Sequence, residues 1–313
     1  MSQNILITGG LGYLGGRLAS YLSTKEEAVR LTTRPTDCPL PNWADRHEVF
    51  VADFGAAKLP EHLCSGIDTV IHLAALNAQQ SAEDPEQAIQ TNIIGTYNLI
   101  NNAIAAGVKR FIYMSTAHVY GRPLEGTINE DTVPMPKHPY AWTHRAAEDV
   151  VNSATGIEGV VLRMTNAVGV PKDPSVNCWM LVANCLCREA IAEGSITLRG
   201  SGEDFRDFIA MNDVCRAMKH ILDLSISGNN SKIYNLGGGG AVSIIEFAER
   251  IADRVALRFQ RRPKVKRGLF KGKHQILDYR IDRLLGTGFC LKGNLDIEID
   301  ETLAFCANTL DPI

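Results

Sequence analysis

The sequence lacks the features that would place the protein in or beyond a membrane. None of its apolar runs approaches the ~20 residues that a membrane-spanning helix needs. The N-terminus enters a β-rich segment at once and has no signal-peptide pattern, so we expect a cytoplasmic protein with no membrane partner. The formal net charge of −3 over 313 residues argues against nucleic acid as the main partner.

Paired cysteines are also missing. The eight cysteines include no Cys-x-x-Cys pair, and the tightest group, Cys178, Cys185 and Cys187, lies in a segment that is predicted to be helical. Buried free thiols explain this distribution better than zinc ligands or disulfides, so we expect no metal site. The sequence also contains no internal repeat, which excludes a repeat array.

What the sequence does contain is an alternation of short β-rich runs and helical stretches through its first half. This rhythm is typical of an α/β protein with a parallel, doubly wound sheet. The two longest helices are expected at Asp84–Ala106, which has Pro85 at its first position, and at Tyr140–Ser153. The predicted strands are Asn4–Thr8, Ala28–Thr33, Val49–Ala52, Thr69–Leu73, Arg110–Ser115 and Val160–Met164.

A glycine-rich segment, Thr8-Gly9-Gly10-Leu11-Gly12-Tyr13-Leu14-Gly15, follows the first predicted strand and leads into a helical stretch. Gly9 permits a tight turn, Gly12 lets the backbone approach a pyrophosphate, and Gly15 lets the helix pack closely. The helix N-terminus offers N–H donors and a positive dipole end to phosphates. The pattern predicts a Rossmann-type fold that binds a dinucleotide.

The second half is organised differently. After Gly169 the alternation loosens, and we expect a helix near Cys178–Ala192 and short strands near Ile196–Arg199 and Ile233–Leu236. The predicted organisation is a dinucleotide-binding domain over residues 1–168, joined by strands that return from the C-terminal half. Residues 169–313 would form mainly a smaller α/β lobe that binds substrate.

Along nearly its whole length the chain resembles the extended short-chain dehydrogenase/reductase superfamily, the NAD(P)-dependent nucleotide-sugar epimerases and dehydratases. The resemblance rests on the glycine segment and on a series of later motifs: Asp53, His72-Leu73-Ala74-Ala75, Asn92, Ser115-Thr116-Ala117-His118-Val119-Tyr120-Gly121, Tyr140 after Pro139, Leu162-Arg163-Met164-Thr165-Asn166, Arg206-Asp207-Phe208-Ile209 with Asp213, and Tyr234-Asn235-Leu236-Gly237. It implies an enzyme that binds NAD or NADP. The cofactor-binding residues implied are Gly9, Gly12, Tyr13, Leu14, Gly15, Arg34, Asp53, Phe54, Leu73, Ala74, Ala75, Asn92, Ser115, Tyr140 and His144.

Such a site takes a proton from a hydroxyl and passes the adjacent hydride to a nicotinamide. The resemblance makes Tyr140 the base and Thr116 the group that hydrogen-bonds the reacting oxygen of the substrate. The alternative for Tyr140 is a packed aromatic ring with its hydroxyl at the surface. For Thr116 the alternative is an ordinary hydroxyl at the end of a strand.

The sequence departs from the family pattern at His144, where Tyr-x-x-x-Lys is expected. The spacing still puts both side chains on one helix face, so His144 can lie near the tyrosine oxygen or the ribose. A lysine is a permanent cation that lowers the pKa of the tyrosine, whereas a histidine with a pKa of ~6.5 is only about a quarter protonated at pH 7. The site is therefore either a modified but working one, in which His144 acts as an imidazolium or a neutral partner, or a catalytically weakened nucleotide-binding site.

A second departure follows Thr116 directly. The related 4,6-dehydratases have an acidic pair there, and Ala117-His118 lacks it, which disfavours ordinary water elimination. His118 is a candidate for proton exchange at a sugar carbon next to a transient ketone, or else a histidine that only ends a strand or loop. We therefore predict epimerisation of a nucleotide-diphosphate sugar through a transient keto sugar. The alternative is an NAD(P)H-dependent reductase or dehydrogenase of the same fold.

Ligand choice gives two further expectations. After the second strand, Thr33-Arg34 offers a hydroxyl and a guanidinium, which suits a 2′-phosphate and favours NADP over NAD, although Asp37 nearby weakens the argument. For the nucleotide sugar, the family pattern assigns Thr116, Asn166 and Arg206, with Arg206 as a bidentate partner of the diphosphate.

The two long helices also predict a homodimer. Their apolar faces exceed what one sheet layer requires, and by resemblance they would pair with their copies about a two-fold axis. The residues of these faces are Ile89, Ile93, Ile100, Ile104, Ala146, Val150 and Val151.

Overall fold

The computed structural model describes residues 3–35, 39–56, 58–225, 232–269 and 276–309. The chain falls into two compact units. The first unit takes residues 1–122, 132–164 and 221–234, and the second takes 123–131, 165–220 and 235–313. Each unit thus draws segments from both halves of the sequence, whereas the predicted domains 1–168 and 169–313 are continuous; that division stays a prediction.

The first unit contains a seven-stranded sheet in the order β11-β7-β5-β4-β1-β2-β3. Every pairing between β3 and β7 in this order is parallel, which confirms the predicted doubly wound α/β architecture. The strand order reverses between β1 and β4, and ligands of such sheets bind outside the carboxyl ends of the strands at this point. The strands are β1 (Asn4–Thr8), β2 (Ala28–Thr33), β3 (Glu48–Val51), β4 (Thr69–His72), β5 (Arg110–Thr116), β7 (Glu158–Met164) and β11 (Ile233–Leu236).

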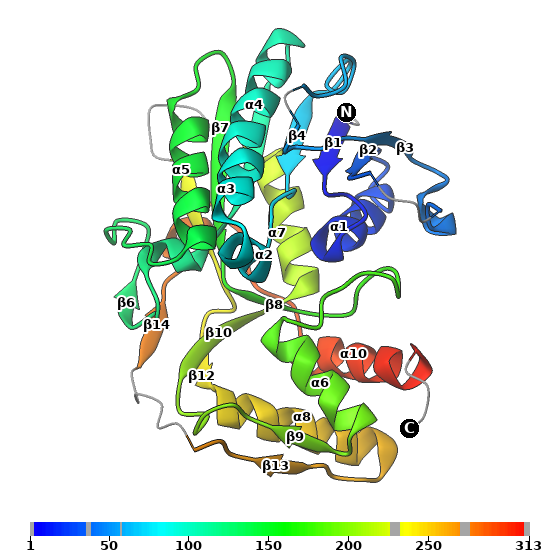
Figure 1. The fold of residues 1–313 in the computed structure, drawn as a ribbon, viewed down its shortest axis with the longest axis vertical. Coiled ribbons are helices and arrows are strands. Elements are labelled where there is room, and N and C mark those ends of the chain that lie inside the picture. The colour runs from blue at the N-terminus through cyan, green and yellow to red at the C-terminus, as the bar shows by residue number, and fades with distance from the viewer. Residues whose placement is uncertain (1–2, 36–38, 57, 226–231, 270–275, 310–313) are drawn as a thin grey trace. The chain divides into compact units, whose positions relative to one another are not determined.

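The central strands β1, β4 and β5 are buried on both faces because they are apolar at successive positions. One face packs against α4 (Gly95–Ala105) and α5 (Pro139–Ser153), which lie side by side (Figure 1). This core includes Leu6, Val70, Phe111, Tyr113 and Val161 from the sheet and Leu99, Ile100, Ala103, Ala147 and Val151 from the helices. The alternate strand residues Ile5, Ile7, Ile71 and Ile112 point to the other face and are equally buried.

The core corrects part of the predicted dimer face. Ile100 and Val151 are 2% and 1% exposed, because they pack against the sheet of their own chain. Their assignment to an intermolecular face is therefore wrong. The exposed apolar side chains along this helical stretch are Ile89, Ile94 and Tyr97. The homodimer itself stays a prediction.

The predicted helix Asp84–Ala106 is present but is not one regular α-helix. It consists of α3 (Pro85–Ala88), a π-helical turn at Ile89–Ile94, and α4. Asp84 caps α3 by accepting a hydrogen bond from the backbone N–H of Gln87 (2.9 Å). The π turn inserts extra backbone into the helix and brings Asn92 inward, where it is 1% exposed.

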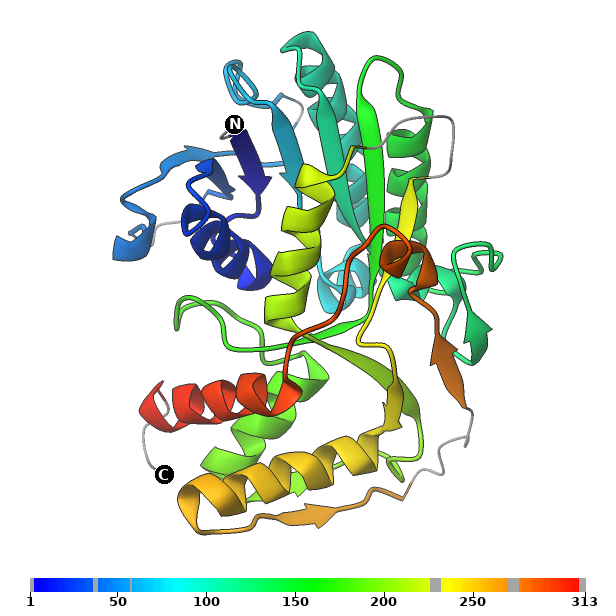
Figure 2. The ribbon, with the colours of Figure 1, turned by 180° about the vertical axis from the view of Figure 1, so that it is seen from behind.

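The second unit has its own core, formed where α6, α8 and α10 pack together (Figure 2). Phe208 and Phe247 stack in it with ring centroids 3.8 Å apart. The helices are α6 (Val182–Ala192), α8 (Ile244–Phe259), α9 (Asp282–Leu285) and α10 (Leu295–Thr309), together with α7 (Met211–Asp223), whose last three residues belong to the first unit. The strands are β6 (Gly126–Ile128), β8 (Asn166–Val168), β9 (Ser195–Thr197), β10 (Phe205–Ala210), β12 (Ala241–Ser243), β13 (Lys264–Lys266) and β14 (Leu277–Tyr279).

The expectations about cysteines, membrane helices and metal ligands concern individual side chains and helices of this fold. All cysteines in the described ranges are free, and Cys178 and Cys187 are buried as expected, whereas Cys185 is partly exposed. No helix in those ranges has both the length and the apolar character needed to cross a membrane. The same part of the chain contains no group of three His, Cys, Asp or Glu side chains that could hold a metal ion.

Candidate active site

The glycine segment forms the turn between β1 and α1 (Tyr13–Ser23). Gly9 has φ +63°, in the left-handed region that glycine adopts without strain. A Cβ on Gly15 would lie 2.2 Å from the carbonyl oxygen of Gly9, so only glycine lets α1 approach the turn this closely. Gly12 stands before the first residue of α1, which has no side-chain cap and no acidic residue in its first turn. These features fit a phosphate-binding helix N-terminus.

A buried network joins the ends of β1 and β4. The Thr8 hydroxyl accepts hydrogen bonds from the backbone N–H groups of Leu73 (3.0 Å) and Ala74 (3.1 Å), so its own proton goes to His72 Nδ1 (2.7 Å). His72 Nε2 then donates to Thr96 (3.0 Å). Both ring nitrogens of His72 are satisfied, and burial lowers its pKa to about 3, so the imidazole is neutral. The network fixes the loop that carries Leu73, Ala74 and Ala75.

Asn92 connects that loop to α5. Its Oδ1 accepts from the backbone N–H of Leu76 (2.8 Å), and its Nδ2 donates to the Thr143 hydroxyl (3.0 Å). Thr143 lies one residue before His144 on α5. In this structure the Asn92 side chain therefore positions α5, and its predicted contact with a cofactor stays a prediction.

The residues expected near the adenine of the cofactor differ in exposure. Arg34 and Asp53 are exposed, and the Asp53 carboxylate accepts from the backbone N–H of Gly55 (2.8 Å). The Phe54 side chain is 5% exposed and packs in the core beside the His72 ring, and its predicted contact with a cofactor stays a prediction. Asp37 lies outside the described residues.

Tyr140 and His144 stand on the first two turns of α5, where the four-residue spacing puts both rings on one face. Their ring centroids are 4.5 Å apart in an edge-to-face arrangement. Burial raises the pKa of Tyr140, while a hydrogen bond with Thr116 at the end of β5 acts in the opposite direction. The structure therefore brings the predicted residues Tyr140, Thr116 and His144 together.

His144 is buried, with 3% of its surface exposed. Its Nδ1 lies 2.6 Å from the hydroxyl of Tyr113 on β5. Its Nε2 is also buried and has no hydrogen-bond partner within the ranges that the structure covers. Burial, with His118 and His138 adding to the effect, lowers the pKa of His144 to about 3. The histidine is thus neutral near pH 7, which favours the neutral partner over the imidazolium.

Two further histidines lie beside Tyr140. The His138 ring is parallel to the Tyr140 ring, with centroids 6.0 Å apart, and the rings of His138 and His118 are 5.8 Å apart. Desolvation and the nearby charge of Arg122 lower the pKa of His138. His138 was not predicted as a site residue, although its place two residues before Tyr140 is a signal in the sequence.

Ser115 faces a buried ion pair rather than open space. Its hydroxyl donates to Glu148 (2.5 Å), whose two carboxylate oxygens also accept from Nε and Nη2 of Arg163 (2.9 and 2.6 Å). Arg163 donates from Nη1 to the Tyr120 hydroxyl (2.9 Å). Glu148 was not predicted, and nothing in its sequence neighbourhood signals this long-range pairing. The network holds the middle of α5 against β5 and β7.

The predicted substrate residues Asn166 and Arg206 belong to the second unit. Asn166 Nδ2 donates to the backbone carbonyl of Asp207 (2.9 Å), and Arg206 donates to the carbonyl of Phe205 (2.9 Å). Asp207 is 1% exposed, and burial raises its pKa although Thr165 and the N–H groups of the Gly237–Gly240 turn hydrogen-bond it. Asp207 therefore anchors that turn, and its neighbour Arg206 is partly exposed.

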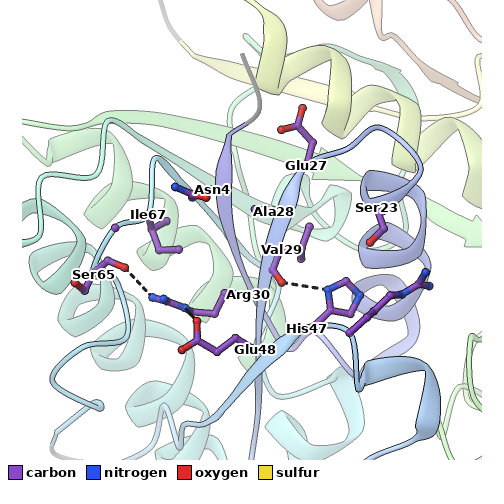
Figure 3. A pocket seen from close by; sticks show the side chains of 12 residues that line it. Asn4, Ser23, Glu27, Ala28, Val29, Arg30, His47, Glu48, Ser65 and Ile67 are labelled. Atoms are coloured by element: carbon purple, nitrogen blue, oxygen red, sulfur yellow. Dashed lines mark hydrogen bonds and ion pairs between the residues drawn. The ribbon is translucent and has the colours of Figure 1, made fainter.

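A cavity of about 580 Å³ lies elsewhere in the first unit (Figure 3). It is lined at the amino ends of β1 and β2 by Asn4, Ala28 and Val29 among others. Arg30 in its wall is already bound to Glu48 (2.7 Å) and to the carbonyl oxygen of Ser65 (2.9 Å). Because nucleotides bind at the carboxyl ends of the strands, this cavity is not the cofactor site.

Comparisons with known proteins agree with this geometry. A sequence model of the NAD dependent epimerase/dehydratase family matches residues 5–237. The chain is 29% identical to the dTDP-glucose 4,6-dehydratase of Streptomyces niveus, over 80% of this chain and 76% of that protein. It is 28% identical to the UDP-glucose 4-epimerase of Halalkalibacterium halodurans, over 78% of each. The solved structure of MoeE5 in complex with UDP-glucuronic acid and NAD is similar with a TM-score of 0.80 and 25% identity, over 98% of this chain and 100% of that one.

Proposed function

Since this chain belongs to the NAD dependent epimerase/dehydratase family and is an enzyme of that type, we propose that it modifies the sugar of a nucleotide-diphosphate sugar. The observation that carries the proposal is the cluster of Tyr140, Thr116 and His144 at the start of α5, in the same unit as the glycine turn. A nicotinamide dinucleotide, when bound, supplies the hydride acceptor and donor.

The chain's own residues fit such a cofactor. Gly9, Gly12 and Gly15 keep side chains away from the N-terminus of α1, which can hold a pyrophosphate. The buried Nε2 of His144 has no partner in the described chain, and a ribose hydroxyl would supply one. These two observations come from different elements, so the fit does not depend on one motif.

The reaction we propose is epimerisation through a transient keto sugar. Thr116 hydrogen-bonds the reacting hydroxyl, and Tyr140 in its phenolate form takes the hydroxyl proton during oxidation. The resulting phenol of Tyr140 returns that proton when the ketone is reduced on its other face, which restores the phenolate. Ala117 and His118 occupy the positions of the acidic pair of 4,6-dehydratases, so this site lacks the carboxylates for ordinary water elimination. Epimerisation needs no such pair.

A second candidate, reduction of a keto sugar, is favoured by one observation. Burial raises the pKa of Tyr140, and its neighbour His144 is neutral, so Tyr140 holds its proton near pH 7. A protonated tyrosine is suited to donate a proton to a ketone that is being reduced. In that case each turnover would consume reduced cofactor, whereas an epimerase would leave its cofactor unchanged.

For the cofactor we propose NAD. The proposal rests on MoeE5, which was solved with NAD. Arg34, the residue that favoured NADP in the sequence, is exposed. For the nucleotide sugar we propose that Asn166 and Arg206 of the second unit bind the diphosphate. Arg206 is the stronger candidate because a guanidinium forms two parallel hydrogen bonds to phosphate oxygens.

The test is to purify the protein under native conditions and identify bound ligands by mass spectrometry. UDP-, dTDP- and GDP-hexoses are then supplied while the nicotinamide absorbance is followed and products are resolved by chromatography. An epimerase converts one sugar into its epimer with no net change in absorbance, and a reductase consumes reduced cofactor with a keto sugar. Firm cofactor binding with no turnover of any nucleotide sugar would instead support a catalytically weakened binding protein.

A further inference from the structure

Tyr113, the hydrogen-bond partner of His144, is absent from the motifs that indicated the active site. Tyr113 lies on β5, three positions before Thr116, and its side chain points into the core under α5, where it is 1% exposed. Its hydroxyl lies 2.6 Å from Nδ1 of His144. This contact joins the sheet to the residue that replaces the lysine of the family motif.

Protons can be placed on this pair in two neutral ways. If Tyr113 donates to Nδ1, the imidazole carries its proton on Nε2. If Nδ1 instead donates to Tyr113, the phenol proton needs another acceptor and Nε2 becomes a bare acceptor. Tyr113 has no other hydrogen-bond partner among the described residues, so the second arrangement leaves two buried polar groups unpaired, whereas the first leaves one. Buried unpaired groups are costly, and the first arrangement is therefore favoured.

A cationic His144 is disfavoured by its surroundings. The titratable groups that face it are Tyr113 on β5, His72 on β4, His118 after β5, His138 just before α5, and Tyr140 on α5. None of these is a carboxylate. Glu148, one turn further along α5, already makes two hydrogen bonds with Arg163. A buried imidazolium would therefore have no anion to compensate it.

We propose that Tyr113 is a positioning residue that selects the His144 tautomer with its proton on Nε2, so that a neutral donor replaces the lysine cation of the family motif. The donor is buried, has no partner in the described chain, and lies on the face of α5 that Tyr140 shares. The use of this donor for a nicotinamide ribose hydroxyl rests on the proposed function. The choice of tautomer does not.

The direct test is nuclear magnetic resonance of protein labelled with ¹⁵N in its histidines. Two- and three-bond ¹⁵N–¹H couplings distinguish the Nε2–H tautomer, the Nδ1–H tautomer and the cation. The His144 signals are assigned by their loss in His144→Gln. We expect a neutral Nε2–H imidazole from pH 6 to pH 8. A cation or a predominant Nδ1–H tautomer in the wild-type protein would overturn the proposal, whatever its catalytic activity.

A second experiment measures cofactor binding rather than turnover. In Tyr113→Phe the aromatic ring stays and only the hydroxyl is lost, so both tautomers of His144 become populated. We expect NADH to bind at least threefold more weakly to this variant, while ADP, which has no nicotinamide ribose, binds as to the wild type. Equal weakening for both ligands would show that the change acts through the fold, and unchanged NADH binding would show that the cofactor does not use the His144 donor.

The matched control is Tyr279→Phe. Tyr279 is also buried, at 3% exposure, and its hydroxyl donates to Asn235 (2.9 Å), but it belongs to the second unit. This variant loses the same atom and the same kind of hydrogen bond. We expect it to change neither the His144 signals nor the difference between NADH and ADP. If the protein turns over no nucleotide sugar, the proposed function fails while the tautomer measurement still decides this inference.

Discussion

Two buried histidines of the same unit, His72 at the end of β4 and His144 on α5, show how similar residues can have different uses. Both are at most 3% exposed, and burial lowers the pKa of both to about 3. His72 has a hydrogen-bond partner on each ring nitrogen, Thr8 and Thr96, whereas within the described part of the chain the only hydrogen-bond partner of His144 is Tyr113. A fully paired polar group stabilises the fold, while a half-paired group in a ligand-binding unit is available to a ligand. On our proposal, the unsatisfied ring nitrogen of His144 is what makes it, and not His72, the residue that a ligand can use.

The largest expected effect is at Tyr140, the ring that His144 touches. Tyr140→Phe removes the proton-carrying oxygen and no core volume. We expect kcat/KM to fall about 10²- to 10⁴-fold, as for loss of a general acid–base, with NADH affinity nearly unchanged. Steady-state kinetics and a binding titration check this. Activity within tenfold of the wild type would show that Tyr140 is not the proton carrier.

Replacing His72 and His144 separately by alanine tests whether the two histidines differ in role. His72→Ala removes the acceptor of the Thr8 hydroxyl proton and the donor to Thr96, and it empties the space of a fully buried ring. We expect it to lower the free energy of unfolding by about 2–5 kcal/mol. His144→Ala orphans only the Tyr113 hydroxyl and should cost about 1–3 kcal/mol. It should, however, weaken NADH binding more than ADP binding. Urea unfolding measures the change in stability, and titration with NADH and ADP measures the change in binding. Equal changes in the two variants would show that His72 and His144 do not differ in role.

Restoring the lysine of the family motif at position 144 tests whether a charge there affects Tyr140. In His144→Lys a positive charge beside Tyr140 favours the phenolate, so the pKa of Tyr140 should fall by about 1–3 units. The pH profile of kcat/KM for sugar oxidation should then move to lower pH by the same amount. Superimposable profiles under conditions where chemistry limits the rate would show that charge at position 144 does not reach Tyr140.

Acid should act on both histidines alike. Each has a pKa of about 3 in the folded protein and an ordinary value of 6.5 in the unfolded chain. Below pH 6.5 the unfolded chain therefore binds more protons, and stability falls as the pH drops from 6.5 towards 3, by up to about 1.4 kcal/mol per pH unit for each histidine. Denaturant unfolding between pH 4 and pH 7 checks this, and His144→Gln should reduce the slope. An unchanged slope in that variant would mean that His144 titrates normally.

The smallest expected effect is at Arg34. Its side chain is exposed after β2, and we propose NAD as the cofactor. Arg34→Ala should therefore change the Kd of NADH by less than about twofold, within the few tenths of a kcal/mol typical of surface substitutions. A large selective loss of NADPH binding, with NADPH the tighter ligand in the wild type, would restore the preference that the sequence suggested.

The sequence predicted what depends on local pattern. The turn at Gly9–Gly15, the parallel strands and the pairing of Tyr140 with His144 all follow from spacing within one or two elements. Contacts between distant segments were missed, such as Tyr113 with His144 and Glu148 with Arg163, because periodicity does not show which side chains meet across a core. Ile100 and Val151 were assigned to the wrong surface for the same reason, since an apolar helix face does not show whether sheet or partner covers it.

Because of the π turn at Ile89–Ile94, the position of Asn92 depends on the number of residues in this stretch. Removing one residue there would let α3 and α4 join as a continuous α-helix, and every side chain on one side of the junction would turn by about 100° relative to the other. Asn92 could then no longer reach both Leu76 and Thr143. Single-residue deletions in this stretch should therefore be far less tolerated than substitutions at the exposed Ile89 or Ile94, which keep the register of the helix.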